Sequence, residues 1–346
     1  MDNINGGTMR YRSMKILTAP CLLSIIGCLM PLASLAGEAG LPTVRFVQSG
    51  RTASSWPLFI GQEKKFFQKN GIYLEEIIVR GGPNTTRAVL SNTIPIGRIN
   101  PDYVIDAIEK GAKVKIISGA MEKIPYDVVA RSEIKSGADL RGKTVGVDSL
   151  TGGTTLMLRE VFEKAYKLSE KDYKLLVVGT SPDRYAALKG GSVQVTFMGP
   201  PFNLRARHEG FTRLTTFHEH LGPIQFVVQF ANDDYLKSNR AEVVKFLKAM
   251  AEATKWLYDP KNKEEAIGVY TKILKSPRET AEADYRYLIE EFKPFSLDGS
   301  INKQAIEKTF DLREKSGKYE GKKAPSYTSY VDMTLVDDAK KQLGSK

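Results

Sequence analysis

The segment GADLRGKT, residues 137–144, has the glycine and lysine spacing of a P-loop, so it could hold the phosphates of a nucleotide. A working P-loop lies between a strand and a helix, whose N-terminal N–H groups surround the phosphates. Here the strand-like run TVGVDS follows the motif, and a polar stretch precedes it. Lys143 would therefore lie at the entry to a strand. We interpret the segment as a surface turn before a buried strand, and we expect no nucleotide cofactor.

A better anion site comes next, where SLTGGTT, residues 149–155, lies between that strand and an amphipathic helix. Free backbone N–H groups and hydroxyls would then lie at the positive end of the helix dipole, which favours an anion. The segment lacks the GxGxxG spacing of dinucleotide-binding folds. An ordinary strand–helix turn, with Gly for positive φ and Thr as the N-cap, explains the same residues equally well. Local sequence leaves both interpretations open.

Residue types that carry nucleophilic or metal chemistry are scarce. Cys21 and Cys28 both lie in an N-terminal apolar segment, so an exported mature protein would have no cysteine for a thiolate, a disulfide or a metal. His218 and His220 flank Glu219, but no third ligand is obvious, and we interpret the pair as a loop or surface feature. No GxSxG nucleophile motif occurs. The sequence predicts no catalytic residue, no metal and no cofactor.

Residues 1–36 have the pattern of a cleavable secretory signal peptide. Three basic residues precede an apolar run that is interrupted by small residues and proline, and a small-x-small site lies at residues 34–36. Met14 could be the true start. The run IIGC, ending at Cys28, loosely resembles a lipoprotein cleavage site, although the apolar segment continues past it. We expect a periplasmic protein, with lipid anchoring at Cys28 as an alternative.

The charge pattern argues against a nucleic-acid partner. The 346-residue chain has a formal net charge of +11, and removal of residues 1–36 would leave about +9. No block of Lys and Arg stands out, because basic and acidic residues alternate as they do on solvated helix faces. A chain of this length can form one large or two ordinary domains with an ample core.

Strand-like and helix-like runs alternate from residue 43 onward, which predicts an α/β fold with mostly parallel sheets. A helix is expected over residues 57–71, and Asn100 is expected to cap another helix that has Pro101 in its first turn. The chain after residue 233 is almost all helical. The expected strands cover residues 43–49, 73–82, 94–99, 113–121, 144–149, 174–180 and 193–198, with a further extended run over 222–233.

This organisation suggests two lobes, with 37–130 and 224–346 forming the first and 131–223 the second. Two extended segments, near Val128 and Phe226, would cross between them. In such sheets a ligand binds beyond the carboxyl ends of the strands, where loops enter helices. We expect six loops rich in Gly, Ser, Thr and Arg to converge on one cleft suited to an organic anion. They are residues 49–56, 80–82, 98–101, 149–155, 179–184 and 198–202.

Several motifs together resemble bacterial ABC-transporter substrate-binding proteins, in the subfamily that binds aliphatic sulfonates, taurine and thiamine precursors. They are WPLFIGQEKKFFQKNGI, IKSGADLRGKTVGV, DRYAALKGGSV and ATKWLYDPKNKEEAI, and the match runs from about Val44 to Val336. The resemblance implies a two-lobed periplasmic-binding-protein-like (type II) fold. It also implies a small molecule held between the lobes and delivered to an ABC permease and ATPase in the inner membrane. Relatives often read SGEVDFG where this chain has SNTIPIGRIN, so the contact at Asn100 can differ.

The predicted site holds an anionic head on the N–H and hydroxyl groups of residues 151–154, with Arg184 as a charge partner. Trp56, Met198 and Phe202 would form apolar walls. Arg184 could instead cap a helix or pair with a neighbour, and Trp56 could belong to the core. The predicted ligand-binding residues are Ser54, Trp56, Gly82, Asn100, Ser149, Thr151, Gly152, Gly153, Thr154, Arg184, Met198 and Phe202.

Three other functions remain open at this point. The ligand could be a neutral thiamine-precursor pyrimidine. The chain could be a pyrimidine-synthesising enzyme of the same fold, although those enzymes carry a cysteine-rich iron motif that a mature chain without cysteine would lack. It could also be a sensory domain that signals to a membrane receptor. We expect a monomer that binds a small molecule.

Overall fold

The computed structural model describes residues 40–320 and 322–344. The predicted signal peptide, with Cys21 and Cys28, lies outside these residues. In the described part of the chain, no helix is both long and apolar enough to cross a membrane.

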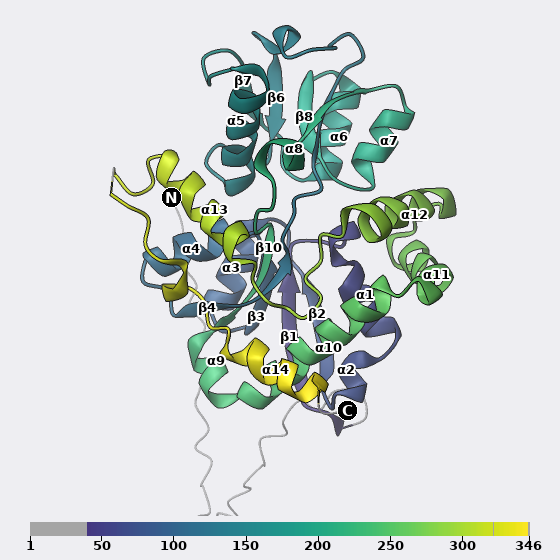
Figure 1. Cartoon of the computed structure of the whole chain (residues 1–346), viewed down its shortest axis with the longest axis vertical. Coiled ribbons are helices and arrows are strands. Elements are labelled where there is room, and N and C mark those ends of the chain that lie inside the picture. The colour runs from purple at the N-terminus through teal and green to yellow at the C-terminus, as the bar shows by residue number, and fades with distance from the viewer. Residues whose placement is uncertain (1–39, 321, 345–346) are drawn as a thin grey trace, which may run out of the picture. The chain divides into compact units, whose positions relative to one another are not determined.

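The strands form two five-stranded sheets, each mostly parallel with antiparallel additions (Figure 1). The first sheet has the order β2-β1-β3-β10-β4, and β10 is antiparallel to both of its neighbours. The second has the order β7-β6-β8-β5-β9, and β5 is antiparallel to both of its neighbours. The expected α/β class is confirmed. The bounds are β1 Thr43–Gln48, β2 Tyr73–Ile78, β3 Ile96–Ile99, β4 Val114–Met121, β5 Asp127–Ala130, β6 Thr144–Val147, β7 Lys174–Val177, β8 Val195–Met198, β9 Thr212–Thr216 and β10 Val227–Asn232.

The chain passes from the first sheet to the second between β4 and β5, and it returns between β9 and β10. The two crossing segments hydrogen-bond to each other. Ile224 N donates to Glu122 O, and Phe226 N donates to Met121 O. No observation tests the lobe boundaries predicted from the sequence, after residue 130 and after residue 223. β5, which begins at Asp127, belongs to the second sheet.

Helices cover both faces of each sheet (Figure 1). In the second sheet, Val128 and Ala130 of β5 pack in the cluster that includes α5, whereas Val129 packs in the cluster that includes α6 and α7. This alternation is what a strand buried on both faces requires. The bounds are α1 Trp56–Glu63, α2 Phe66–Lys69, α3 Gly82–Leu90, α4 Pro101–Glu109, α5 Gly153–Tyr166, α6 Ser181–Gly190, α7 Phe202–His208, α8 Phe217–Leu221, α9 Asp233–Ser238, α10 Arg240–Tyr258, α11 Lys263–Leu274, α12 Arg278–Tyr285, the π-helix η5 Arg286–Phe292, α13 Lys303–Lys315 and α14 Thr334–Gly344.

The helix expected over residues 57–71 is interrupted, which corrects the prediction. α1 ends at Glu63, and Lys65 takes the left-handed conformation with φ of 56° before α2 begins. The break turns Phe67 into the core, where its ring stacks on Phe246 at 5.9 Å between centroids. Burial of an aromatic ring offsets the cost of the left-handed residue.

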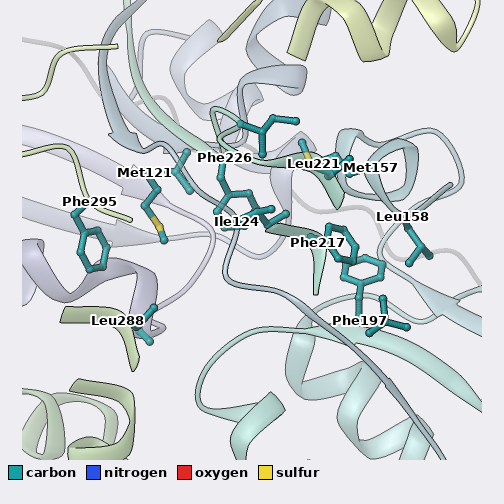
Figure 2. Close-up of a cluster of buried hydrophobic side chains, with 14 of the residues drawn as sticks. Met121, Ile124, Met157, Leu158, Phe197, Phe217, Leu221, Phe226, Leu288 and Phe295 are labelled. Carbon is teal, nitrogen blue, oxygen red and sulfur yellow. The ribbon is translucent and has the colours of Figure 1, made fainter. Parts of the chain in front are cut away.

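A large apolar cluster joins the two sheets at the crossing segments (Figure 2). It brings together Met121 at the end of β4, Phe197 of β8 and Phe217 of α8. Phe226, just before β10, and Leu288 of the π-helix η5 belong to the same cluster. Both of these residues also line the pocket described below.

Candidate ligand-binding site

A pocket of about 530 Å³ lies where the loops after the parallel strands of both sheets meet. Each of the six loops singled out from the sequence contributes to its lining, and so do the crossing segments and η5. The lining residues are Ser49, Gly50, Arg51, Thr52, Ala53, Ser54, Ile78, Arg80, Gly81, Gly82, Pro83, Arg98, Ile99, Asn100, Tyr103, Pro125, Tyr126, Asp148, Ser149, Thr154, Gly179, Thr180, Ser181, Pro182, Arg184, Gly199, Pro200, Phe202, Phe226, Val227 and Leu288.

The structure brings seven of the twelve predicted site residues into this lining. They are Ser54, Gly82, Asn100, Ser149, Thr154, Arg184 and Phe202. The other five do not line the pocket. They are Trp56, Thr151, Gly152, Gly153 and Met198.

Trp56 and Met198 face the core, in contrast to the apolar walls that we expected. The Trp56 ring packs 4.2 Å from Tyr270 between centroids, and its indole N–H donates to Ala266 O at 3.2 Å. Met198, the last residue of β8, is fully buried in the cluster with α6 and α7. Phe202 does line the pocket, and its ring lies 5.8 Å from Tyr185.

The N-terminus of α5 is occupied by a carboxylate of the protein itself. Asp148 accepts hydrogen bonds from the Thr154 hydroxyl at 2.8 Å and from Ser149 N at 2.9 Å, whereas the Thr155 hydroxyl donates to Ser149 O at 2.6 Å. A hydroxyl has a single hydrogen to donate, so Thr154 can only accept through this group. Sequence reasoning expected Thr154 to donate to a ligand, and it could not see that Asp148 competes for the same donor.

The two glycines at the start of α5 serve close packing. A Cβ at Gly153 would lie 2.9 Å from Asp102 Cβ and 3.0 Å from Asn100 Oδ1, at the start of α4. Gly152 N donates to Ser149 Oγ at 2.7 Å. Gly153 therefore lets α5 of the second lobe approach α4 of the first, while a Cβ at Gly152 would clash with Ser149 Oγ.

Asn100 is occupied by the fold as well, as the predicted N-cap of α4. Its side-chain oxygen accepts from Asp102 N at 3.0 Å, and its amide group donates to Phe226 O at 3.2 Å. The predicted cap is therefore confirmed.

Arg184 is a buried cation in the pocket wall. Its guanidinium donates to Phe197 O at 3.0 Å, to Gly179 O and to Ser181 Oγ at 3.2 Å, and it lies 4.1 Å from the centroid of the Phe197 ring. Burial lowers its pKa, although nearby Tyr126 and Asp148 oppose the shift. Within the described residues no carboxylate forms an ion pair with Arg184.

A second buried cation, Arg98 of β3, also lines the pocket, and sequence reasoning did not select it. Within the described part of the chain its guanidinium donates to Ser54 alone, through the backbone oxygen and the hydroxyl. Burial lowers the pKa of Arg98 to about 10, while Glu76 acts in the opposite direction. Glu76 itself accepts from Arg51 at 2.6 Å, so its charge is already paired. The sequence feature that could have identified Arg98 is its position as an arginine inside the apolar run IPIGRI.

The remaining charges at the pocket rim are paired. Arg51 binds Glu76, and Arg80 lies 3.3 Å from Asp183. Apolar surface is supplied by Phe226 and Leu288, which belong to the cluster between the sheets. The site thus combines two buried guanidiniums with apolar walls, an arrangement that suits an organic anion.

A larger hollow, of about 780 Å³, lies on the surface around α3 and α4. Its charged lining residues are exposed or already paired, as Asp106 is with Arg313. We therefore assign the ligand site to the pocket between the sheets.

The histidine pair lies in the short helix α8 and is half-buried, which corrects the loop or surface position expected from the sequence. His220 Nε2 lies 2.7 Å from Thr215 Oγ1, and the His218 ring packs 5.1 Å from Phe292. No group of three or more His, Cys, Asp or Glu residues in the described part of the chain is placed to hold a metal.

Comparisons with known proteins agree with this description. The family model described as "NMT1/THI5 like" matches residues 52–263, more than half of the chain. YtlA of Bacillus subtilis, named only provisionally as a binding protein, is 24% identical over 336 residues, which cover 94% of this chain and 97% of YtlA.

Solved structures share the fold at low sequence identity. The alkanesulfonate-binding protein SsuA of Xanthomonas axonopodis pv. citri, bound to MOPS, has a TM-score of 0.70 at 16% identity, covering 84% of this chain and 98% of SsuA. A ligand-binding component of an ABC-type import system from Staphylococcus aureus has a TM-score of 0.70 at 14% identity, covering 86% of this chain and 98% of that one. The desulfurization enzyme DszB has a TM-score of 0.63 at 11% identity, covering 87% and 99%. The resemblance to substrate-binding proteins and the two-lobed fold expected from the sequence are confirmed.

Proposed function

We propose that the chain, which belongs to the NMT1/THI5-like family, is a periplasmic solute-binding protein that captures a small organic anion, a carboxylate or a sulfonate. The observation that carries the proposal is Arg184, a buried guanidinium in a pocket wall with no carboxylate bound to it among the described residues. A bound anion would supply the missing partner, and Arg suits the planar geometry of such groups. Delivery to an ABC permease and ATPase, and export through residues 1–36, belong to the same proposal.

Binding is favoured over catalysis because of what lines the pocket. Its described lining includes no His, Lys or Cys, the side chains that most often activate a nucleophile or transfer a proton. The carboxylate there, Asp148, accepts hydrogen bonds from Ser149 N and from the Thr154 hydroxyl at the start of α5. The fold also occurs in an enzyme, DszB, so fold alone does not decide the question.

A thermal-unfolding screen tests the proposal. The full chain is denatured and refolded to remove carried ligand, then heated with alkyl and aryl sulfonates, carboxylates, nitrate and neutral pyrimidines. A ligand at a hundred times its Kd adds about 2.7 kcal/mol to the free energy of unfolding, which raises the melting temperature measurably.

We expect a shift with an organic anion, and we expect Arg184→Gln to weaken its binding on the order of 100-fold. Arg205→Gln is the matched control, since Arg205 is exposed on α7 and paired with Glu209 at 3.2 Å. A shift with pyrimidines alone would contradict the anion assignment while keeping a binding protein. Anion binding that survives Arg184→Gln unchanged would remove the role given to this residue.

A further inference from the structure

Arg98 lies in a row of buried polar side chains that crosses the first sheet. In the strand register it pairs with Gln48 of β1 on one side and with Gln229 of β10 on the other. Ser118 of β4 continues the row and donates to Gln229. Burying a row of polar side chains in an otherwise apolar sheet costs free energy, because each group must be desolvated. We therefore expect the row to have a function.

The guanidinium of Arg98 is left with free donors that face the pocket. Its described hydrogen bonds, both to Ser54, use two of its five N–H groups. Arg184, on α6 of the second lobe, uses three of its five for Phe197 O, Gly179 O and Ser181 Oγ, and the Tyr126 hydroxyl is a further partner. Both residues line the same pocket, one from each lobe.

Neither guanidinium can avoid the free-energy cost of a buried charge by losing its proton at neutral pH. Even after burial the pKa of Arg98 stays at about 10, far above neutral pH. The two nearest acids are also engaged elsewhere. Glu76 accepts from Arg51, Gln48 and Gln62. Asp148 accepts from Ser149 N and from the Thr154 hydroxyl, at the positive end of α5.

The two cations are held by different parts of the molecule. Arg98 donates to Ser54 in the first lobe, whereas Arg184 donates to Gly179, Ser181 and Phe197 in the second. Their described hydrogen bonds therefore give them no common partner, so each can receive an acidic group of its own. Apolar side chains, among them Phe226 and Phe202, line the same pocket and offer contact for an uncharged body.

We propose that the ligand is an organic dianion whose two acidic groups are separated by an apolar spacer, one group bound by Arg98 and the other by Arg184. This inference rests on the proposed function and specifies its ligand class. Each acidic group would complete the hydrogen bonding of one guanidinium, and the spacer would lie against the aromatic and aliphatic wall.

Calorimetric titration with matched pairs of probes tests the inference. The diacids are glutarate, adipate, isophthalate, terephthalate and 4-sulfobenzoate. Each is compared with the form in which one carboxylate is a methyl ester, so that the two members differ by one charge. We expect at least one diacid to bind about 10- to 100-fold more tightly than its ester, as one charged hydrogen-bonding site provides.

Variants then assign that preference to the two arginines. In Arg98→Gln and in Arg184→Gln, the diacid should bind no more tightly than its ester. Arg45→Gln should keep the full preference, because Arg45 lies on the first sheet, outside the pocket, paired with Glu75 at 3.2 Å. Arg98→Lys keeps the charge and is expected to retain part of the preference if Arg98→Gln does not fold.

Each outcome decides the inference. Equal affinity of diacids and esters in the unmodified protein overturns it and leaves the proposed function standing. A preference that persists in both arginine variants overturns it as well. Binding of no anion overturns the proposed function and this inference together.

Discussion

Two regions of the molecule bury arginines, and they treat the charge in opposite ways. On α13, Arg313 is 1% exposed and binds Asp102 at 2.5 Å, Asp106 at 2.8 Å and Glu109 at 2.6 Å, all on α4. In the pocket, Arg98 and Arg184 are buried almost as deeply, yet among the described residues they bind only backbone oxygens and hydroxyls.

The difference separates a structural cation from a binding cation. The carboxylates around Arg313 raise its pKa despite burial, so its charge is stabilised by the fold itself. Burial lowers the pKa of Arg98 and of Arg184, so the fold alone does not compensate these charges. A guanidinium that the protein keeps buried without a carboxylate is the kind of group that an anionic ligand can complete.

A buried acid provides the third case. Asp284 of α12 is fully buried, and its described partner is the hydroxyl of Tyr270, with no cation bound. Burial raises the pKa of Asp284 to about 7. A buried carboxyl group can therefore take up a proton and become neutral, whereas an arginine stays charged at physiological pH.

Removing the paired arginine gives the largest expected effect. Arg313→Gln would leave the buried Asp102 with Lys318, 3.7 Å away, as its remaining described cation. We therefore expect a loss of about 3 kcal/mol in the free energy of unfolding, at the lower end for a broken buried ion pair. Urea denaturation followed by circular dichroism measures it. A loss below about 1 kcal/mol would show that the ion-pair cluster does not stabilise the fold, and the comparison would fail at its first step.

Asp284→Asn tests the acid, with an effect that depends on pH. Because the folded pKa is raised, the folded protein binds the proton more tightly than the unfolded chain does. Stability from this group is present below about pH 4 and is lost as the pH rises toward 7. The variant should therefore exceed the original protein by about 1 kcal/mol at pH 4.5 and by about 4 kcal/mol at pH 8. Tyr270 does not titrate in this window, since its pKa is raised above 10.

A constant difference between the two proteins from pH 4.5 to pH 8 would argue against this account. Asn keeps an oxygen that can accept from the Tyr270 hydroxyl, so the hydrogen bond serves as an internal control.

The unpaired arginine should matter less for stability than the paired one. In the ligand-free protein, Arg184→Met removes a charge that forms no ion pair with a described carboxylate, and it leaves the oxygens of Phe197, Gly179 and Ser181 without this donor. We expect the free energy of unfolding to fall by less than about 2 kcal/mol. Urea denaturation in the absence of anions measures the change. A loss as large as that of Arg313→Gln would mean that Arg184 is a structural cation, and it would weaken the case for an anion site.

The sequence predicts the frame of the site well because strand and helix periodicity is local. Alternating apolar runs located the strands, and the rule that loops at strand ends meet brought six separate loops to one pocket. The direction in which each loop side chain points could not be predicted in the same way. Trp56 begins α1, and its direction depends on packing against α11, about 210 residues later in the sequence. Met198 ends β8, and its direction depends on which face of the sheet α6 and α7 cover.

Competition between side chains for the same hydrogen-bond donor is equally hard to predict from the sequence. The hydroxyl of Thr154 was assigned to a ligand, but Asp148, six residues earlier, takes it. Arg98 was missed although it was visible as a lone charge in an apolar strand, because its meaning depends on the carboxylates that surround it. A buried charge is informative only once its partners are known.

Arg45→Gln gives the smallest expected effect and closes the comparison. Arg45 pairs with Glu75 across β1 and β2, and both side chains are exposed, at 40% and 46%. Solvent screens such a pair, so we expect a change below about 1 kcal/mol in the free energy of unfolding and no change in anion binding. The same urea denaturation and titrations measure both. If this exposed pair mattered as much as Arg313, burial would not be what distinguishes the arginines, and the inference from Arg98 and Arg184 would lose its physical basis.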